Sequence, residues 1–221
     1  MYSELLKYSQ TFGPMEEDFY DWHKGRAKYG VWVLELDDEV FLQRYCQAQQ
    51  HLSPYLISHY HRKPHITLAP CGFLMPEKNN ADDYDAASLM QDVDNILSLD
   101  LSVIDCTIRN VLISYAIAPG FEVLDNQGDL GRLNGLLRKA DPMDDNIDYF
   151  PHITVGLYNA QWCTRLILSA LQQFAIEDDI VLQHSVIKLV SYVPTVSGGA
   201  LQDELMINLS DQSMVRRSET F

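Results

Sequence analysis

The sequence predicts an α+β fold in which two small sheets face a central cleft and helices cover the outside. Two observations lead to this prediction. The chain of 221 residues shows the same order of elements twice, namely strand, helix, strand, helix, strand. In addition, the tetrapeptide Pro-His-Ile-Thr begins a strand pattern in each half, and its histidines, His65 and His152, are 87 positions apart.

The elements of the first repeat are predicted from apolar periodicity. Runs of β-branched and aromatic residues favour strands, and apolar side chains three or four positions apart favour helices. On these patterns we expect a strand at 29–36, a helix at 38–52, a strand at 64–69, a helix at 84–97 and strands at 101–108 and 111–118. The last two strands are expected to form a hairpin whose turn is at Arg109-Asn110.

The second repeat follows by the same reasoning. Its first strand corresponds to the one at 111–118, since the strand at 29–36 shifted by 87 positions falls near 113–118. The elements expected after it are a helix at 127–140, a strand at 151–157, a helix at 160–174 and strands at 180–193 and 205–209. Asn159 is a suitable N-cap for the helix at 160–174. The acidic run at 141–148 is expected to be a solvated loop.

The predicted organisation is a single domain at 29–209. Residues 1–28 are expected to form an N-terminal extension that is helical or irregular, and residues 210–221 a polar C-terminal tail.

The charge balance limits the class of ligand. Asp and Glu number 31 against 16 Lys and Arg, which gives a formal charge of −15. A protein that follows a long nucleic acid needs a basic face to neutralise many phosphates. A long nucleic-acid partner is therefore disfavoured, whereas a small anionic ligand in a locally basic pocket is compatible with this composition.

The remaining composition favours a reducing cytoplasm without a membrane partner. A monomer is expected, but the sequence does not set the oligomeric state. The chain has no basic-then-apolar leader pattern at its start and no apolar run of membrane-spanning length. Its four cysteines are far apart in sequence and contain no CxxC pair. We expect them to be buried free thiols.

The two histidines carry the functional prediction. Side chains alternate along a strand, so His65 and Thr67 share one face while Ile66 points to the other, and the same holds for His152, Thr154 and Ile153. Phosphodiester cleavage needs a base for the attacking oxygen and an acid for the leaving oxygen, and histidine serves both roles. Threonine hydroxyls can donate hydrogen bonds to the non-bridging oxygens. The structural alternative is a pair of histidines that merely pack on sheet faces.

The segments Pro64-His65-Ile66-Thr67 and Pro151-His152-Ile153-Thr154 resemble the paired HxT motifs of the 2H phosphoesterase superfamily, which includes RNA 2′,3′-cyclic phosphodiesterases also called 2′-5′ RNA ligases. The resemblance covers about residues 29–209. It implies a bilobal fold of two pseudo-twofold-related antiparallel sheets, with His65 and His152 as catalytic acid and base and Thr67 and Thr154 as phosphate ligands. It also implies catalysis without metal or cofactor on cyclic phosphates or 2′-5′ linkages of nucleotides or RNA. Together with the acidic composition, this predicts a small nucleotide-like substrate, such as a 2′,3′-cyclic phosphate or a 2′-5′-linked or cyclic oligonucleotide.

Further substrate-binding candidates flank the motifs and the first strand. Arg62, Lys63 and Arg26 are basic residues close to the active strands and could form the electropositive rim of a pocket. Tyr158 follows the second motif and could stack on a base. Solvated strand ends and core packing are the alternatives for these residues.

Two other functions remain open at this point. A non-catalytic protein with the same fold could sense a nucleotide, although binding alone does not require two proton-transfer groups. A metal-dependent hydrolase could use His59, His61 and His65, which would share one face of a strand. Sensitivity to a chelator would separate this last function from the first.

Substrate size provides a first test. We expect mono- to tetranucleotide-sized phosphodiesters to be turned over at least as well as the same linkage within a tRNA-length RNA, because an acidic surface repels a polyanion. The salt dependence of kcat/KM should correspond to about one to three phosphate contacts. A side-by-side assay from low to moderate salt checks this. Preference for the long RNA, with a slope equivalent to about six contacts, would contradict it.

Overall fold

The computed structural model describes residues 5–14, 20–138, 149–174, 178–218 and 220. The predicted acidic loop at 141–148 lies outside these residues. The helices are η1 Leu5–Lys7, α1 Tyr20–His23, α2 Glu39–Leu52, η2 Ser53–Tyr55, α3 Ala86–Ser98, α4 Asp129–Leu137 and α5 Thr164–Gln173. The strands are β1 Tyr29–Glu35, β2 His65–Leu74, β3 Asp83–Tyr84, β4 Ile104–Ser114, β5 Pro119–Asp125, β6 His152–Thr154, β7 Ile180–His184, β8 Val186–Tyr192, β9 Gln202–Asn208 and β10 Ser213–Arg216.

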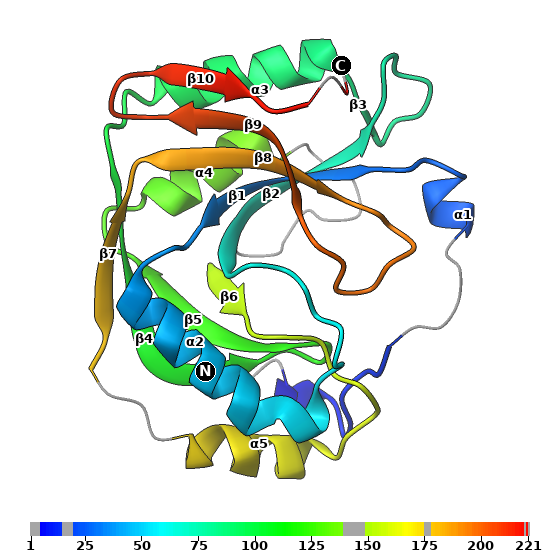
Figure 1. Cartoon of the computed structure of the whole chain (residues 1–221), viewed down its shortest axis with the longest axis vertical. Helices are drawn as coiled ribbons and strands as arrows, with labels where there is room; N and C mark the ends of the chain where they lie inside the picture. The colour runs from blue at the N-terminus through cyan, green and yellow to red at the C-terminus, as the bar shows by residue number, and fades with distance from the viewer. Residues whose placement is uncertain (1–4, 15–19, 139–148, 175–177, 219, 221) are drawn as a thin grey trace.

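The strands form one continuous sheet instead of the two separate sheets that we expected. The order is β10-β9-β8-β1-β2-β6-β5-β4-β7, and β3 pairs with β2 beside this path (Figure 1). All pairs are antiparallel except β2 with β3. The two halves of the sheet meet where Ile66 of β2 pairs with Ile153 of β6. We call the strands from β10 to β2 the β2 half and the strands from β6 to β7 the β6 half.

The order of strands preserves the repeat that the sequence suggests. The first unit is β1-α2-β2-α3-β4, and the second is β5-α4-β6-α5 followed by β7 and β8. Each unit places its final strand in the other half, since β4 lies beside β5 and β8 lies beside β1. The order on either side of the β2–β6 junction is therefore matched: β2, β1, β8 on one side and β6, β5, β4 on the other.

Several predicted boundaries were wrong. Residues 104–114 form the single strand β4, and the hairpin turn comes later, at Tyr115–Ala118, where the Tyr115 N–H donates to the Ala118 carbonyl at 2.9 Å. Arg109-Asn110 offers no glycine or proline to favour a turn, whereas Pro119-Gly120 lies next to the observed one. The strand predicted at 180–193 is divided at Ser185 into β7 and β8. The polar tail contains β10, which extends the sheet as an edge strand.

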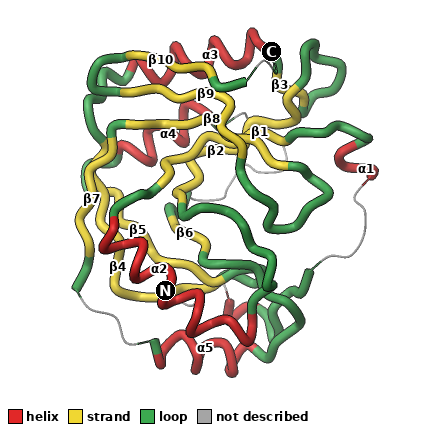
Figure 2. The backbone as a smooth tube through the Cα atoms, viewed as in Figure 1, coloured by secondary structure: helices red, strands yellow, loops and turns green. Residues whose placement is uncertain are grey.

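In the view of Figure 2, α3 and α4 lie behind the strands of the β2 half, and α2 lies in front of β4 and β5 of the β6 half. The side chain of Asp38 caps α2 by accepting a hydrogen bond from the Phe41 N–H, and Phe41 packs edge-on against Phe121 of β5 at 5.5 Å between ring centroids. In the β2 half, Asp92 of α3 accepts hydrogen bonds from the Trp32 indole at 3.0 Å and the Tyr84 hydroxyl at 2.7 Å. These contacts attach α2 to β5 in the β6 half, and α3 to β1 and β3 in the β2 half.

The N-terminal segment of residues 8–13 packs along residues 159–164. Thr11 exchanges backbone and side-chain hydrogen bonds with Trp162, and the Thr164 N–H donates to the Ser9 carbonyl at 3.1 Å. This last bond satisfies a free N–H at the start of α5. The helix begins at Thr164 and not at 160, so Asn159 is not its cap; the Asn159 amide donates to the Leu56 carbonyl instead.

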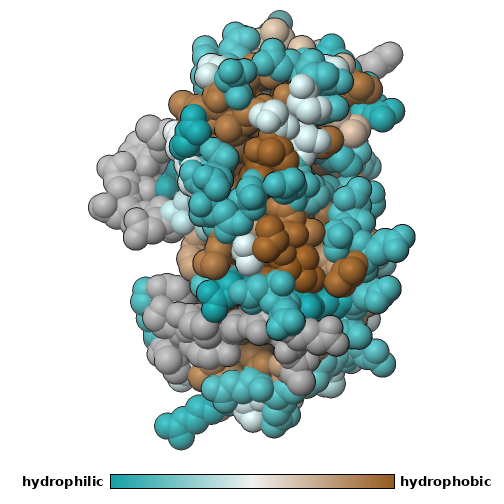
Figure 3. Space-filling model, turned by 90° about the vertical axis from the view of Figure 1, so that its left-hand side faces the viewer, coloured by the Kyte–Doolittle hydropathy of each residue, from teal (hydrophilic) through white to brown (hydrophobic). Residues whose placement is uncertain are grey.

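The exposure of the cysteines differs in part from the prediction. All four cysteines are free, but only Cys71 and Cys106 are buried, whereas Cys46 and Cys163 are exposed. Apolar side chains interrupt the hydrophilic surface at mid-height of the face that carries the edge strand β7 (Figure 3), and Val181 of β7 is 64% exposed.

None of the described helices has the length and apolar character needed to cross a bilayer.

Gly120 provides a test of the packing between β5 and β6. A Cβ at this position would meet the Ile153 carbonyl oxygen at 2.6 Å. Gly120→Ala should therefore lower the free energy of unfolding by about 1–3 kcal/mol, measured by urea denaturation. In Gly135→Ala, where an added Cβ meets nothing within 4 Å in α4, the free energy of unfolding should rise by up to about 1 kcal/mol. Equal stability of both variants would contradict the close approach of the two strands.

Candidate functional site

The pairing of β2 with β6 brings the two motifs together. Ile66 and Ile153 are paired and both are 0% exposed, so they face the core. In an antiparallel pair, this register sets His65 across from Thr154 and Thr67 across from His152, all on the face opposite the core. The histidines are then diagonal neighbours, whose usual separation is about 7–8 Å between Cα atoms. A phosphate group fits between side chains at such a separation.

Each imidazole is oriented by a carbonyl two residues before it. The Nδ1 atom of His65 lies 2.7 Å from the Lys63 carbonyl oxygen, and that of His152 lies 2.9 Å from the Phe150 carbonyl oxygen. Because a carbonyl oxygen only accepts, each Nδ1 must carry the proton and donate. The Nε2 atom of each neutral ring is then the basic nitrogen.

The surroundings keep both imidazoles neutral. Burial lowers the pKa of His65 to about 4, and the positive charges of Arg62 and His152 also lower it, against the raising effects of the Lys63 carbonyl and Glu35. Burial likewise lowers the pKa of His152, and the Phe150 carbonyl opposes this shift. In the ligand-free protein at pH 7, both rings are therefore neutral.

The helices of each unit support the motif strand of the other unit. The Gln49 amide of α2 donates to the Val155 carbonyl at 3.0 Å, and the Asn134 amide of α4 donates to the Leu68 carbonyl at 2.7 Å. Val155 and Leu68 directly follow the motif threonines. These equivalent bonds tie each motif strand to a helix from the opposite repeat. Neither Gln49 nor Asn134 was predicted, because an isolated amide on a helix gives no signal in sequence.

Two tyrosines make a second matched pair of contacts. The Tyr45 hydroxyl donates to the Thr154 carbonyl at 3.1 Å, and the Tyr149 hydroxyl donates to the Thr67 carbonyl at 2.9 Å. These bonds hold the backbone of the threonines and leave the threonine hydroxyls uninvolved. Another aromatic residue, Tyr115, lies beside the second motif, with its ring 4.9 Å from the ring of His152.

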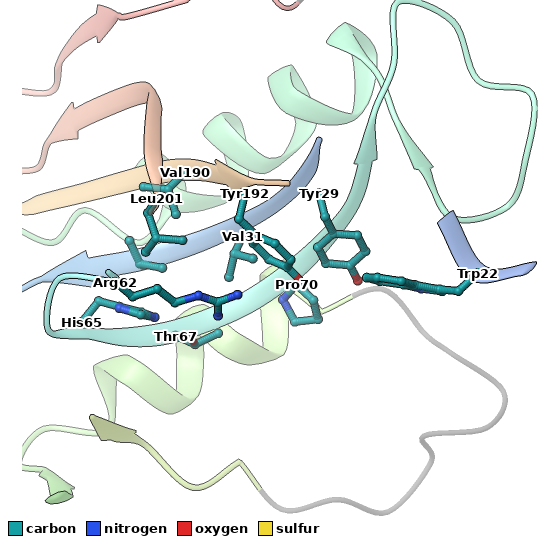
Figure 4. Close-up of a pocket in the computed structure, with 11 residues that line it drawn as sticks. Trp22, Tyr29, Val31, Arg62, His65, Thr67, Pro70, Val190, Tyr192 and Leu201 are labelled. Atoms are coloured by element: carbon teal, nitrogen blue, oxygen red, sulfur yellow. The ribbon is translucent and has the colours of Figure 1, made fainter. Parts of the chain in front are cut away.

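A pocket of about 340 Å³ opens next to the first motif (Figure 4). It is lined by Trp22, Tyr29, Val31, Val33, Arg62, His65, Thr67, Pro70, Val190, Tyr192 and Leu201. His65 and Thr67 lie towards one end, and Trp22 lies at the other. The pocket thus contains the first motif, while His152 and Thr154 are outside its lining.

Arg62 is the predicted basic residue that lines this pocket. Its guanidinium carbon lies 4.5 Å from the centre of the Tyr192 ring, which is a cation–π arrangement. Its Nε atom is buried without a hydrogen-bond partner among the described residues. A guanidinium in this state can bind an anionic ligand without first breaking an ion pair.

Arg26 does not provide a phosphate ligand as predicted. It is only 7% exposed, and its guanidinium binds Asp83 at 2.5 Å and Asp82 at 2.7 Å. Its charge is therefore already neutralised, and the bond to Asp82 is the first cause of its raised pKa. Arg26 serves instead to hold the segment around α1 on the sheet, as its bond to the Trp22 carbonyl at 2.7 Å shows.

Two other predicted ligands are also placed elsewhere. Tyr158 is 1% exposed, and its hydroxyl forms a hydrogen bond with Ser114, so it packs in the core and cannot stack on a substrate. Lys63 is exposed and paired with Glu35 at 3.0 Å, and it does not line the pocket. Glu35 lies across from His65 in the β1–β2 register and also binds Lys188 at 3.1 Å.

The described residues contain no group of three or more His, Cys, Asp or Glu side chains arranged to hold a metal ion. His59 and His61, which the sequence placed with His65 on a strand, precede β2 in an irregular segment, and both are exposed. They therefore do not share a strand face with His65.

No protein-family model and no curated protein sequence matches this chain. Two solved structures of E. coli LigT are similar to it, one complexed with NADP+ and one with ATP. Each aligns over 83% of this chain and 99% of the LigT chain, with 12% sequence identity and a TM-score of 0.49. A similarity at this sequence identity and TM-score does not establish a shared family or a shared chemistry.

The depressed pKa of His65 predicts a loss of stability in acid. The pKa is about 4 in the folded state against about 6.5 in an unfolded chain, so the folded state binds this proton less readily. The stabilising contribution is present above pH 6.5 or so and decreases as pH falls towards about 4. When the pH is lowered from 7.5 to 4.5, the free energy of unfolding should fall in both proteins. In His65→Gln we expect this fall to be smaller than in the unmodified protein by roughly 2–3 kcal/mol.

The control for this experiment is His59→Gln, which changes an exposed histidine outside the pocket. Its unfolding free energy, measured in urea at each pH, should fall as much as that of the unmodified protein. If His65→Gln also falls by that amount, His65 is not held neutral by burial.

Proposed function

We propose that this chain is a metal-independent phosphodiesterase that acts on a small nucleotide-like substrate by acid–base catalysis with two histidines. The observation that supports this most directly is the pairing of Ile66 with Ile153, because it sets two His-x-Thr pairs on one face of the sheet. Two proton-transfer groups on either side of one position are what displacement at phosphorus requires.

The two histidines take different roles in this proposal. The base must be neutral, and His65 has the deeper burial and a pKa of about 4, so we assign it as the base. Its Nε2 removes the proton from the attacking water, and the His152 imidazolium donates a proton to the oxygen that leaves phosphorus. His65 thus gains one proton and His152 gives one up. Exchange of protons with the solvent then returns both residues to their starting states. An anionic phosphate bound between the rings favours the protonation of His152.

The charge on the phosphate is stabilised by neutral donors and one cation. The hydroxyls of Thr67 and Thr154 can donate to the non-bridging oxygens, and Arg62 supplies the positive charge in the pocket. With one arginine in the pocket and a formal charge of −15 overall, the site is suited to a single phosphodiester more than to a polyanion. Cyclic phosphates and short 2′-5′-linked oligonucleotides fit this description.

Replacement of either histidine tests the mechanism. His65→Ala and His152→Ala should each lower kcat by about 10²–10⁴-fold on a 2′,3′-cyclic nucleotide, and the double variant should be scarcely worse, because the residues act as a unit. Thr67→Ala and Thr154→Ala should have milder effects, and His59→Ala should leave kcat unchanged. Full activity in one single histidine variant would remove that residue from the mechanism.

The same assay across pH, in the presence and absence of EDTA, separates this mechanism from a metal-dependent one. The profile of kcat/KM against pH should be bell-shaped. Its acidic limb should lie at about pH 4, where His65 loses its proton, and its basic limb below pH 6.5, because burial lowers the pKa of His152 from its ordinary value. Such an optimum is more acidic than unperturbed histidines would give. Loss of activity in EDTA that a divalent ion restores would contradict the proposal, and nucleotide binding without turnover would favour the sensor function.

A further inference from the structure

The pocket beside His65 continues well beyond the first motif. It follows β2 from His65 to Pro70 and ends at Trp22 of α1 (Figure 4). Val31 of β1 and Val190 of β8 also line it, so its floor is apolar sheet surface. A single phosphate group needs only the end that contains His65 and Thr67, and the catalytic proposal leaves the rest of the pocket without a role.

Three aromatic rings form a row in this remaining part. The ring of Tyr192 lies 5.5 Å from the ring of Tyr29, which in turn lies 5.2 Å from the ring of Trp22. Arg62 stands over Tyr192 at the end near His65. Planar π-surfaces next to a guanidinium plane are a common arrangement for stacking nucleobases.

The charge of this part excludes a polyanionic occupant. Among the described residues that line the pocket, no Asp, Glu or Lys is present, and Arg62 is the arginine. A second phosphate placed along the pocket would have to leave water for a valine and tyrosine surface without a cation beside it, which is costly. An uncharged flat ring would bury apolar surface there instead.

We propose that the row Tyr192–Tyr29–Trp22 is a nucleobase subsite, so that the substrate carries one base on the His65 side of the scissile phosphodiester and no further phosphate there. This inference rests on the proposed function and narrows its substrate class to nucleoside phosphodiesters. Trp22 closes the far end of the subsite. It comes from the segment before the first repeat, so this segment contributes to specificity.

The buried ion pair of Arg26 supports this role for Trp22. Arg26 binds the Trp22 carbonyl and the carboxylates of Asp82 and Asp83, and its guanidinium stacks on the Phe73 ring at 3.6 Å. The Trp22 ring packs against the same Phe73 ring at 5.0 Å. A four-residue helix would not hold its tryptophan against the sheet by itself, and Arg26 supplies the missing attachment.

Calorimetric titration with two probes of equal phosphate charge tests the subsite. Adenosine 3′-monophosphate should bind about 5- to 100-fold more tightly than ribose 3-phosphate. Trp22→Leu, which keeps an apolar side chain and removes a ring, should weaken binding of the adenosine probe by about 5-fold or more and leave binding of the ribose probe unchanged. Tyr192→Leu should weaken the adenosine probe more than the ribose probe, because it removes a stacking ring as well as the contact with Arg62. Trp162→Leu is the matched control, since Trp162 packs against Tyr55 away from this pocket. Equal affinity for both probes would overturn the subsite.

Turnover distinguishes a failure of the subsite from a failure of the proposed function. Adenosine 2′,3′-cyclic phosphate should have a higher kcat/KM than ribose 2,3-cyclic phosphate, by the same factor as the binding preference, and Tyr192→Leu should abolish this difference. If both are turned over equally, the subsite is wrong and the phosphodiesterase stands. If neither is turned over while the adenosine probe binds preferentially, the subsite stands and the phosphodiesterase is wrong. Rescue of the preference by Tyr192→Phe would support stacking over a role of the hydroxyl.

Discussion

The pairing of Ile66 with Ile153 is the contact on which the rest of the structure depends. It is the junction between the two halves of the sheet, and it is made by the residue in the centre of each His-x-Thr motif. Because both isoleucines are fully buried, the histidines and threonines beside them must face the other way. The same contact therefore closes the core and creates the arrangement of polar groups on the opposite face. A shift by one residue would bury the imidazoles and expose the isoleucines.

The exchange of elements between the repeats makes this junction rigid. Each motif strand is held by a helix amide from the other unit, Gln49 at Val155 and Asn134 at Leu68, and each unit gives its last strand to the other half of the sheet. The two halves cannot separate without breaking these bonds. The proton transfer that we propose would require the two imidazoles to keep a fixed separation, and a junction shared by both repeats would provide that.

Burial has opposite consequences for the charged groups near the site. It makes the protonation of His65 unfavourable. The ion pair of Arg26 with Asp82 and Asp83 tolerates burial because each of its charged groups has a hydrogen-bonded partner of opposite charge. Of Arg26 and Arg62, it is Arg62 that lines the pocket. The acidity of the chain as a whole and the positive charge at this position are therefore compatible, since one guanidinium in an apolar pocket is enough for one phosphodiester.

The sequence by itself determined the two motif strands, the alternation that separates Ile from His and Thr, and the repeated order of strands and helices, because local periodicity and caps such as Asp38 encode them. Only the tertiary structure decided which strands pair, and so it joined the expected sheets into one and moved the hairpin to Tyr115–Ala118. It also buried Tyr158, paired Arg26 with Asp82 and Asp83, and brought Trp22 beside Tyr29. These outcomes depend on residues far apart in the chain, and a pattern that records which face a side chain occupies does not record which neighbour it will meet.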